Sequence, residues 1–164
     1  IIIYVDVSGS MNGESELWSK AIAFVVTEEA IKQKREVEIV LFDSYIQDSF
    51  KIKPDSSNKQ DLLKFVLTWT THGGTSFVTV INHLLNKTDL DKKADVLMIT
   101  DGHANVPDAY VQRLKRFKNE VSLDWNTFCI GKVSTTVESF SDSVHTVDTN
   151  DDPKSSDLFQ NVLM

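Results

Sequence analysis

Short apolar runs recur along the chain, and segments with helical periodicity separate them. Each run is bounded by polar or turn-forming residues, as expected of strands buried on both faces of a parallel sheet. The runs occupy residues 1–5, 37–42, 94–100, 124–130 and 143–148. Apolar residues spaced three and four apart predict helices over residues 14–33, 62–69, 77–85, 110–121 and 155–164. This alternation predicts a Rossmann-like α/β fold with a mostly parallel central sheet and helices on both of its faces.

Residues 45–52 have a different pattern. Ile46, Phe50 and Ile52 alternate with polar neighbours, which is typical of a half-exposed strand. The segment follows the run 37–42 after only Asp43 and Ser44, so a hairpin is expected. The sheet should therefore contain one antiparallel edge strand.

The composition indicates one globular domain and limits its partners. The chain has 164 residues, of which 41% are hydrophobic, enough for one core. Because it begins inside a strand pattern, we expect a single domain, residues 1–164, excised from a longer protein. A net charge of −7 disfavours nucleic acid or an anionic membrane as the main partner, and the N-terminal apolar run is too short for a membrane span.

Isolated reactive side chains are interpreted as structural. The basic residues Arg113, Lys115, Arg116 and Lys118 have helical spacing and should form a solvated helix face. The single cysteine, Cys129, lies in a strand-like run and should be a buried thiol, and a chain without disulfides suits a reducing, cytoplasmic location. The four histidines are scattered, and none is interpreted as a zinc ligand.

Oxygen-bearing side chains follow two of the predicted central strands. Asp6, Ser8 and Ser10 come directly after the first strand, two residues apart, so that their side chains can converge. Asp101 ends the strand before Gly102, and Thr75 follows the glycine pair at 73–74. Hard oxygen ligands without Cys or His favour Mg²⁺, with Mn²⁺ or Ca²⁺ also possible.

Several neighbours of these residues are candidates for the rim of such a site. Met11 and Asn12 follow the first motif and are expected to be exposed. His72 and His103 adjoin Thr75 and Asp101 and could hydrogen-bond an incoming acidic partner.

The series D-x-S-x-S, G-G-T and strand-T-D-G resembles the metal-ion-dependent adhesion site of the von Willebrand factor A (VWA) domain. The resemblance implies metal ligation by Asp6, Ser8, Ser10, Thr75 and Asp101, the two aspartates acting largely through water. The amino-acid sequences of residues 5–11, 39–43 and 147–149 are similar to those of bacterial VWA proteins of the ViaA and CoxE type. Since those proteins work with MoxR-type AAA+ ATPases, the resemblance also implies such a partner.

The function expected from this resemblance is binding rather than catalysis. A metal ion with an open position would bind a Glu or Asp side chain of a partner protein. One alternative is a Mg²⁺-dependent phosphohydrolase, which the serine at position 8 disfavours, because such enzymes carry a second acid there. An extracellular adhesion domain and a VWA subunit of a metal-chelatase complex are further alternatives.

Overall fold

The central element is a six-stranded sheet with the order β3-β2-β1-β4-β5-β6. The computed structural model describes residues 1–55, 59–88, 90 and 94–149. The strands are β1 (Ile2–Asp6), β2 (Val37–Phe42), β3 (Ile46–Ile52), β4 (Asp95–Thr100), β5 (Asp124–Ile130) and β6 (Ser143–Val147). Five are parallel and β3 pairs with β2 in antiparallel orientation, so the predicted sheet is confirmed.

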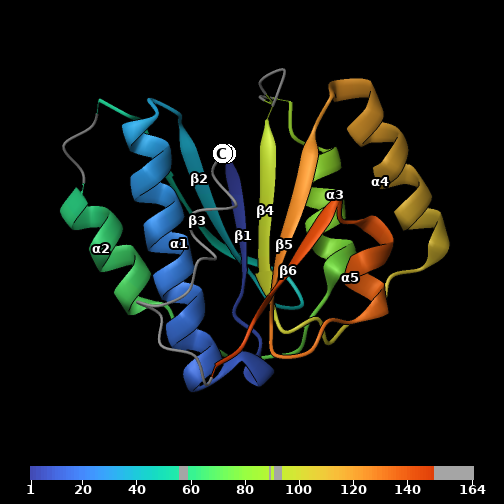
Figure 1. Cartoon of the computed structure of the whole chain (residues 1–164), viewed down its shortest axis with the longest axis horizontal. Coiled ribbons are helices and arrows are strands. Elements are labelled where there is room, and N and C mark those ends of the chain that lie inside the picture. The colour runs from blue at the N-terminus through green and yellow to red at the C-terminus, as the bar shows by residue number, and fades with distance from the viewer. Residues whose placement is uncertain (56–58, 89, 91–93, 150–164) are drawn as a thin grey trace.

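Helices cover both faces of this sheet (Figure 1). One face carries α1 (Glu14–Lys32) and α2 (Lys59–Thr68), and the other carries α3 (Phe77–Leu85), α4 (Asp108–Val121) and α5 (Thr135–Phe140). A 3-10 turn, η1 (Gly9–Met11), joins β1 to α1. The Rossmann-like architecture expected from the sequence is therefore confirmed.

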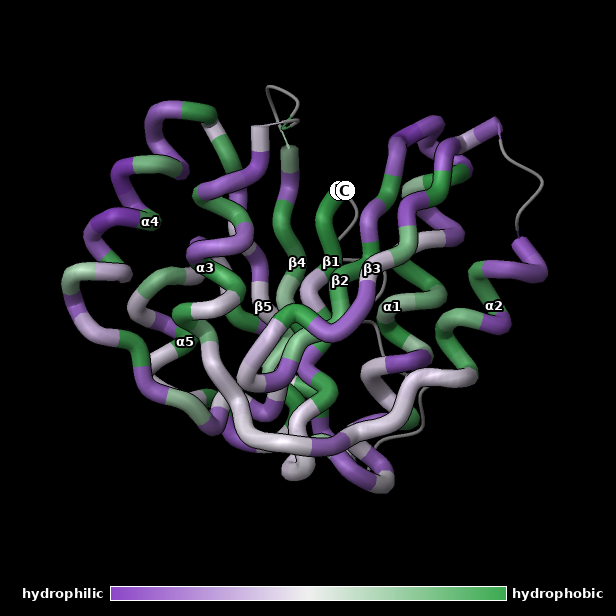
Figure 2. The backbone as a smooth tube through the Cα atoms, turned by 180° about the vertical axis from the view of Figure 1, so that it is seen from behind, coloured by the Kyte–Doolittle hydropathy of each residue, from purple (hydrophilic) through white to green (hydrophobic). Residues whose placement is uncertain are grey.

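Each central strand contributes to two hydrophobic layers. In β1, Ile3 and Val5 pack in the layer under α1 and α2, whereas Ile2 and Tyr4 pack in the layer under the other three helices. Side chains alternate between the faces of a strand, so a strand covered on both sides must be apolar throughout. Figure 2 shows this as continuous hydrophobic colour along β1 and β4, while the edge strand β3 is mostly hydrophilic.

The alternation in β3 is interrupted by an irregularity in its pairing with β2. The register shifts between Leu41 and Phe42. As a result Ile46 packs in the layer of α3, whereas Phe50 and Ile52 belong to the layer of α1 and α2. The three apolar residues therefore do not all share one face of β3, because a bulge moves the side chains beyond it to the other face.

Lys118 departs from the solvated face predicted for α4. Arg113, Lys115 and Arg116 are exposed, as expected, but Lys118 is buried. Its Nζ donates to the Phe140 carbonyl oxygen at 2.9 Å and forms an ion pair with Asp142 at 2.7 Å. Spacing alone cannot reveal such a buried, paired lysine.

The helix predicted over residues 155–164 lies outside the described residues. Within the described part of the chain, no helix combines the length and apolar character needed to cross a bilayer.

Candidate metal centre

The candidate ligands lie where the direction of strand order reverses. β1 is flanked by β2 and β4, and the chain builds the sheet outward from it in both directions. Asp6 ends β1, and Asp101 follows β4 directly, so both lie at the carboxyl edge of the sheet, the lower edge in Figure 1. Open α/β sheets bind ligands at this position.

The Asp6 carboxylate is fully buried and held by hydrogen bonds. Its Oδ1 accepts from the Ser8 amide at 2.9 Å, and its Oδ2 accepts from the Thr100 hydroxyl at 2.6 Å. Burial raises the pKa of Asp6 above its ordinary value; these hydrogen bonds offset the rise in part, and the negative charge of Asp101 adds to it. A cation beside Asp6 would offset the same cost of burial.

Ser8 and Ser10 converge as predicted, with their hydroxyl oxygens 3.2 Å apart. The turn η1 makes this possible by folding the chain back directly after β1. The same turn directs Met11 into the core, where it is fully buried. The prediction of an exposed Met11 was therefore wrong, whereas Asn12 is exposed.

The loop that carries Thr75 is joined to the β1 loop through the backbone. The Gly9 amide donates to the Gly73 carbonyl at 3.0 Å, and the His72 amide donates to the Val7 carbonyl at 2.7 Å. Thr75 itself is half-buried, and its side chain makes no hydrogen bond to the described residues. The structure thus brings the loop to the site without fixing the Thr75 hydroxyl.

Asp43 holds this loop from the other side, a role that the sequence analysis missed. Its buried carboxylate accepts from the Tyr45 amide at 2.8 Å, from Gln47 Nε2 at 2.7 Å and from His72 Nδ1 at 3.1 Å. Burial acts to raise the pKa of Asp43, but the hydrogen bonds from Tyr45, Gln47 and His72 outweigh it and hold the pKa below its ordinary value. The signal was available, since Asp43 follows an apolar strand as Asp6 and Asp101 do.

Gly73 is required at its position for two reasons. Its φ of +73° lies in the left-handed region, and a Cβ there would lie only 2.7 Å from Asp43 Oδ2. Any larger residue would therefore strain the backbone and displace the carboxylate that anchors the loop.

Asp101 is held by its own loop. Its Oδ1 accepts from the His103 amide at 3.1 Å, and its Oδ2 lies 3.0 Å from His103 Nδ1. The positive φ of Gly102, +79°, turns the chain after Asp101 so that this contact can form. The expected rim residues His72 and His103 are both exposed, and each pairs with a carboxylate near the site.

The candidate donor set has the chemistry that a hard divalent cation requires. It consists of two carboxylates and three hydroxyls, the oxygen ligands typical of Mg²⁺ sites. In the described part of the chain, no cluster of three or more His, Cys, Asp or Glu side chains could hold a metal. An ion at this edge would therefore depend on the serine and threonine hydroxyls.

The thiol of Cys129 is buried, and burial raises its pKa, so the structural role predicted for it is supported.

A family model for the von Willebrand factor type A domain matches residues 1–137. The chain belongs to this family. The VWA fold is also found in a solved von Willebrand factor type A structure from Catenulispora acidiphila, which aligns with a TM-score of 0.67 over 90% of this chain and 38% of that one, at 15% identity.

Two curated relatives have similar sequences. The uncharacterized protein MJ0811 of Methanocaldococcus jannaschii is 34% identical over 123 residues, covering 73% of this chain and 28% of that protein. The regulatory protein ViaA of Proteus mirabilis is 30% identical over 122 residues, covering 73% of this chain and 24% of ViaA. The chain thus spans about a quarter of the length of these relatives.

Proposed function

We propose that this VWA domain is a metal-dependent protein-binding module and not an enzyme. Asp6, Ser8, Ser10, Thr75 and Asp101 would hold a divalent cation, with Mg²⁺ the first choice. The bound ion would supply an open coordination position and positive charge for a Glu or Asp side chain of a partner protein.

The arrangement at the end of β1 is the observation that carries this proposal. The Asp6 carboxylate is fixed by the Ser8 amide and the Thr100 hydroxyl, and beside it the Ser8 and Ser10 hydroxyls lie within 3.2 Å of each other. Neutral hydroxyls neutralise less of a cation's charge than carboxylates do. An ion held in this way would favour an additional anionic ligand.

The partner that we propose is a MoxR-type AAA+ ATPase. Two observations support this partner. The chain is similar in sequence to the regulatory protein ViaA, and residues 5–11 and 39–43 resemble the same group of VWA proteins. The net charge of −7 fits a role for a cation, because without one an acidic partner would be repelled by much of the surface.

Calorimetric titration with Mg²⁺ and Mn²⁺ tests the site directly. The parent domain should bind the ion, and Asp6→Ala or Ser8→Ala combined with Ser10→Ala should weaken the affinity at least about 10-fold, since each variant removes ligands. Asp124→Asn is the matched control, because Asp124 is exposed and lies at the amino end of β5, away from the carboxyl ends of the strands where the candidate ligands lie. Equal affinity in all variants would refute the assignment.

A pull-down with a MoxR-type ATPase from the same organism tests the partner. Association is expected in Mg²⁺ and should be lost in EDTA or with the double serine variant. Association that survives both conditions would show that the interface lies away from the metal centre.

A further inference from the structure

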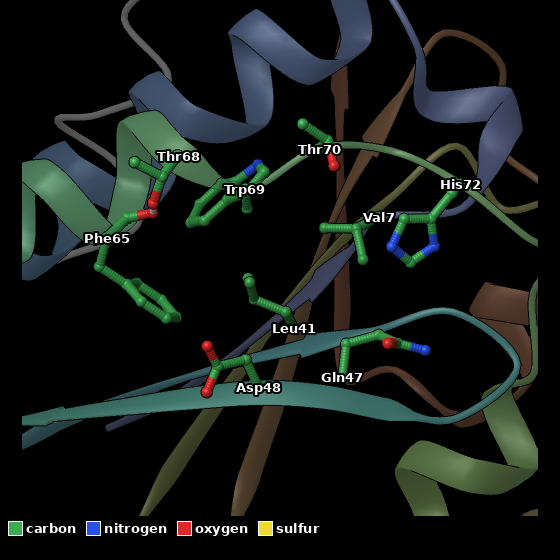
Figure 3. A pocket seen from close by; sticks show the side chains of 9 residues that line it. All are labelled: Val7, Leu41, Gln47, Asp48, Phe65, Thr68, Trp69, Thr70 and His72. Carbon is green, nitrogen blue, oxygen red and sulfur yellow. Dashed lines mark hydrogen bonds between the residues drawn. The ribbon is translucent and has the colours of Figure 1, made fainter.

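A hollow lies beside the candidate metal centre, between the β2–β3 hairpin and the end of α2 (Figure 3). Its volume is about 210 Å³. Small-molecule and cofactor sites typically measure roughly 300–1,000 Å³, so this hollow is of a size for one side chain rather than for a cofactor.

One wall of the hollow is aromatic. Phe65 and Trp69 line it, with their rings in an edge-to-face arrangement and centroids 6.0 Å apart. Phe50 stacks on Phe65 with ring centroids 5.2 Å apart, and Leu41 lies beside Phe65 and below Trp69 in Figure 3. These contacts fix the wall in place.

The opposite wall is polar and carries a negative charge. Asp48 and Gln47 extend from β3 on this side (Figure 3). Asp48 pairs in register with Leu41, so a carboxylate occupies the face of β3 where Phe50 and Ile52 are apolar. Its only hydrogen bond within the described residues is from the neighbouring Ser49 amide, and it has no ion pair there. No lysine or arginine lines the hollow.

We propose that this hollow binds an arginine side chain of a protein partner. The aliphatic stem and planar guanidinium would contact the half-buried Phe65, and the guanidinium would pair with Asp48. Trp69 backs this wall, since it is buried and Lys20 Nζ already lies 5.8 Å from its ring centroid. An apolar side chain fits less well, because it would remove the Asp48 carboxylate from water without supplying a hydrogen-bond donor to it. An acidic side chain would be repelled by Asp48.

The hollow lies next to the candidate metal centre. Val7 and His72 line it, and Val7 stands between the candidate ligands Asp6 and Ser8. A partner whose acidic residue binds at the metal could therefore place a nearby arginine here. That the side chain comes from a protein rests on the proposed function, whereas the preference for a guanidinium rests on the hollow alone.

The test is an NMR titration of the ¹⁵N-labelled domain with N-acetyl-arginine methylamide, in EDTA and at constant ionic strength. N-acetyl-leucine methylamide serves as the apolar comparison. The arginine derivative should shift the Trp69 indole signal and the amides of residues 47–49 and 65–72 in a saturable manner. Asp48→Asn should raise its Kd about three- to fivefold, as expected for loss of an exposed ion pair, and Asp124→Asn should leave it unchanged.

Several outcomes would overturn the proposal. They are tighter binding of the leucine derivative, unchanged affinity in Asp48→Asn, and shifts that cluster away from the hollow. Because no divalent cation is present, the result is independent of the metal proposal, and either can fail while the other holds.

Discussion

Replacing Asp43 should test how the loop that carries Thr75 is held. Asp43 is 4% exposed, and its carboxylate accepts three hydrogen bonds, two from the hairpin residues Tyr45 and Gln47 and one from His72. Asp43→Ala removes both carboxylate oxygens, and with them all three hydrogen bonds, and leaves a small cavity beside Gly73.

The magnitude follows from the exposure of the donors. Hydrogen bonds to a charged group contribute about 1.5–3 kcal/mol each. Gln47 and His72 are exposed and can turn to water, so most of their contribution is recovered. The Tyr45 amide in the tight turn remains the main loss. We therefore expect the free energy of unfolding to fall by about 2–3 kcal/mol, which lowers Tm by about 4–12 °C for a domain of this size.

Urea unfolding followed by circular dichroism measures this loss, and calorimetry with Mg²⁺ measures its effect on the site. Asp48→Ala, on the same hairpin but exposed, is the matched control and should change the unfolding free energy by less than about 0.5 kcal/mol. If Asp43→Ala unfolds like this control, the carboxylate does not anchor the loop.

The lowered pKa of Asp43 makes its contribution dependent on pH. The folded-state pKa lies below the unfolded value of about 3.9, so the stabilisation is fully present above that value and is lost as pH falls through the folded pKa. If the parent domain and Asp43→Ala lose unfolding free energy equally below about pH 4, this prediction is wrong. Gly73→Ala should lower the unfolding free energy by about 1–3 kcal/mol, because of its positive φ and the contact with Asp43, as urea unfolding can measure. Thr100→Val should weaken Mg²⁺ affinity about 10-fold in calorimetry by releasing the Asp6 carboxylate; unchanged affinity would show that Asp6 needs no such support. Lys118→Ala should cost about 1–3 kcal/mol, because it leaves the Phe140 carbonyl without its donor while the 45% exposed Asp142 returns to water, in contrast to a near-neutral Lys115→Ala.

The fold was predictable because its determinants are local and periodic. Apolar runs in β1, β2 and β4 reflect burial on both faces of the sheet. Segments with apolar residues three and four positions apart reflect the helices that cover those faces. The hairpin before β3 was equally clear. The register shift at Leu41 was not, because a bulge depends on how two strands pair rather than on either strand alone.

The candidate site was predictable to the extent that it follows strand ends. Asp6, Ser8, Ser10 and Asp101 come directly after buried strands, and parallel strands bring their carboxyl ends to one edge. Met11 was placed wrongly, because a 3-10 turn of three residues has no hydrophobic period from which its inward direction could be read. The position of Asp43 after an apolar strand marked it as a candidate, but its contact with His72 spans 29 residues of sequence, which no local pattern encodes.

Close packing explains the glycine pair at 73–74, because a Cβ would lie 2.7 Å from Asp43 Oδ2 at Gly73 and 3.1 Å from Ser44 Oγ at Gly74. The loop is tied to the β1 loop by the Gly9 amide and by the His72 amide, and the Ser76 amide donates to the Asp43 carbonyl at 3.0 Å just before α3 begins. Movement of Thr75 toward or away from a ligand must lengthen one or more of these bonds. Ser76 caps α3 by accepting a hydrogen bond from the Thr79 amide, so such a movement would strain this bond and the first turn of the helix. A change at the proposed metal centre would therefore act on α3 and the β2–β3 hairpin together, and the hairpin also forms the Asp48 wall of the neighbouring hollow.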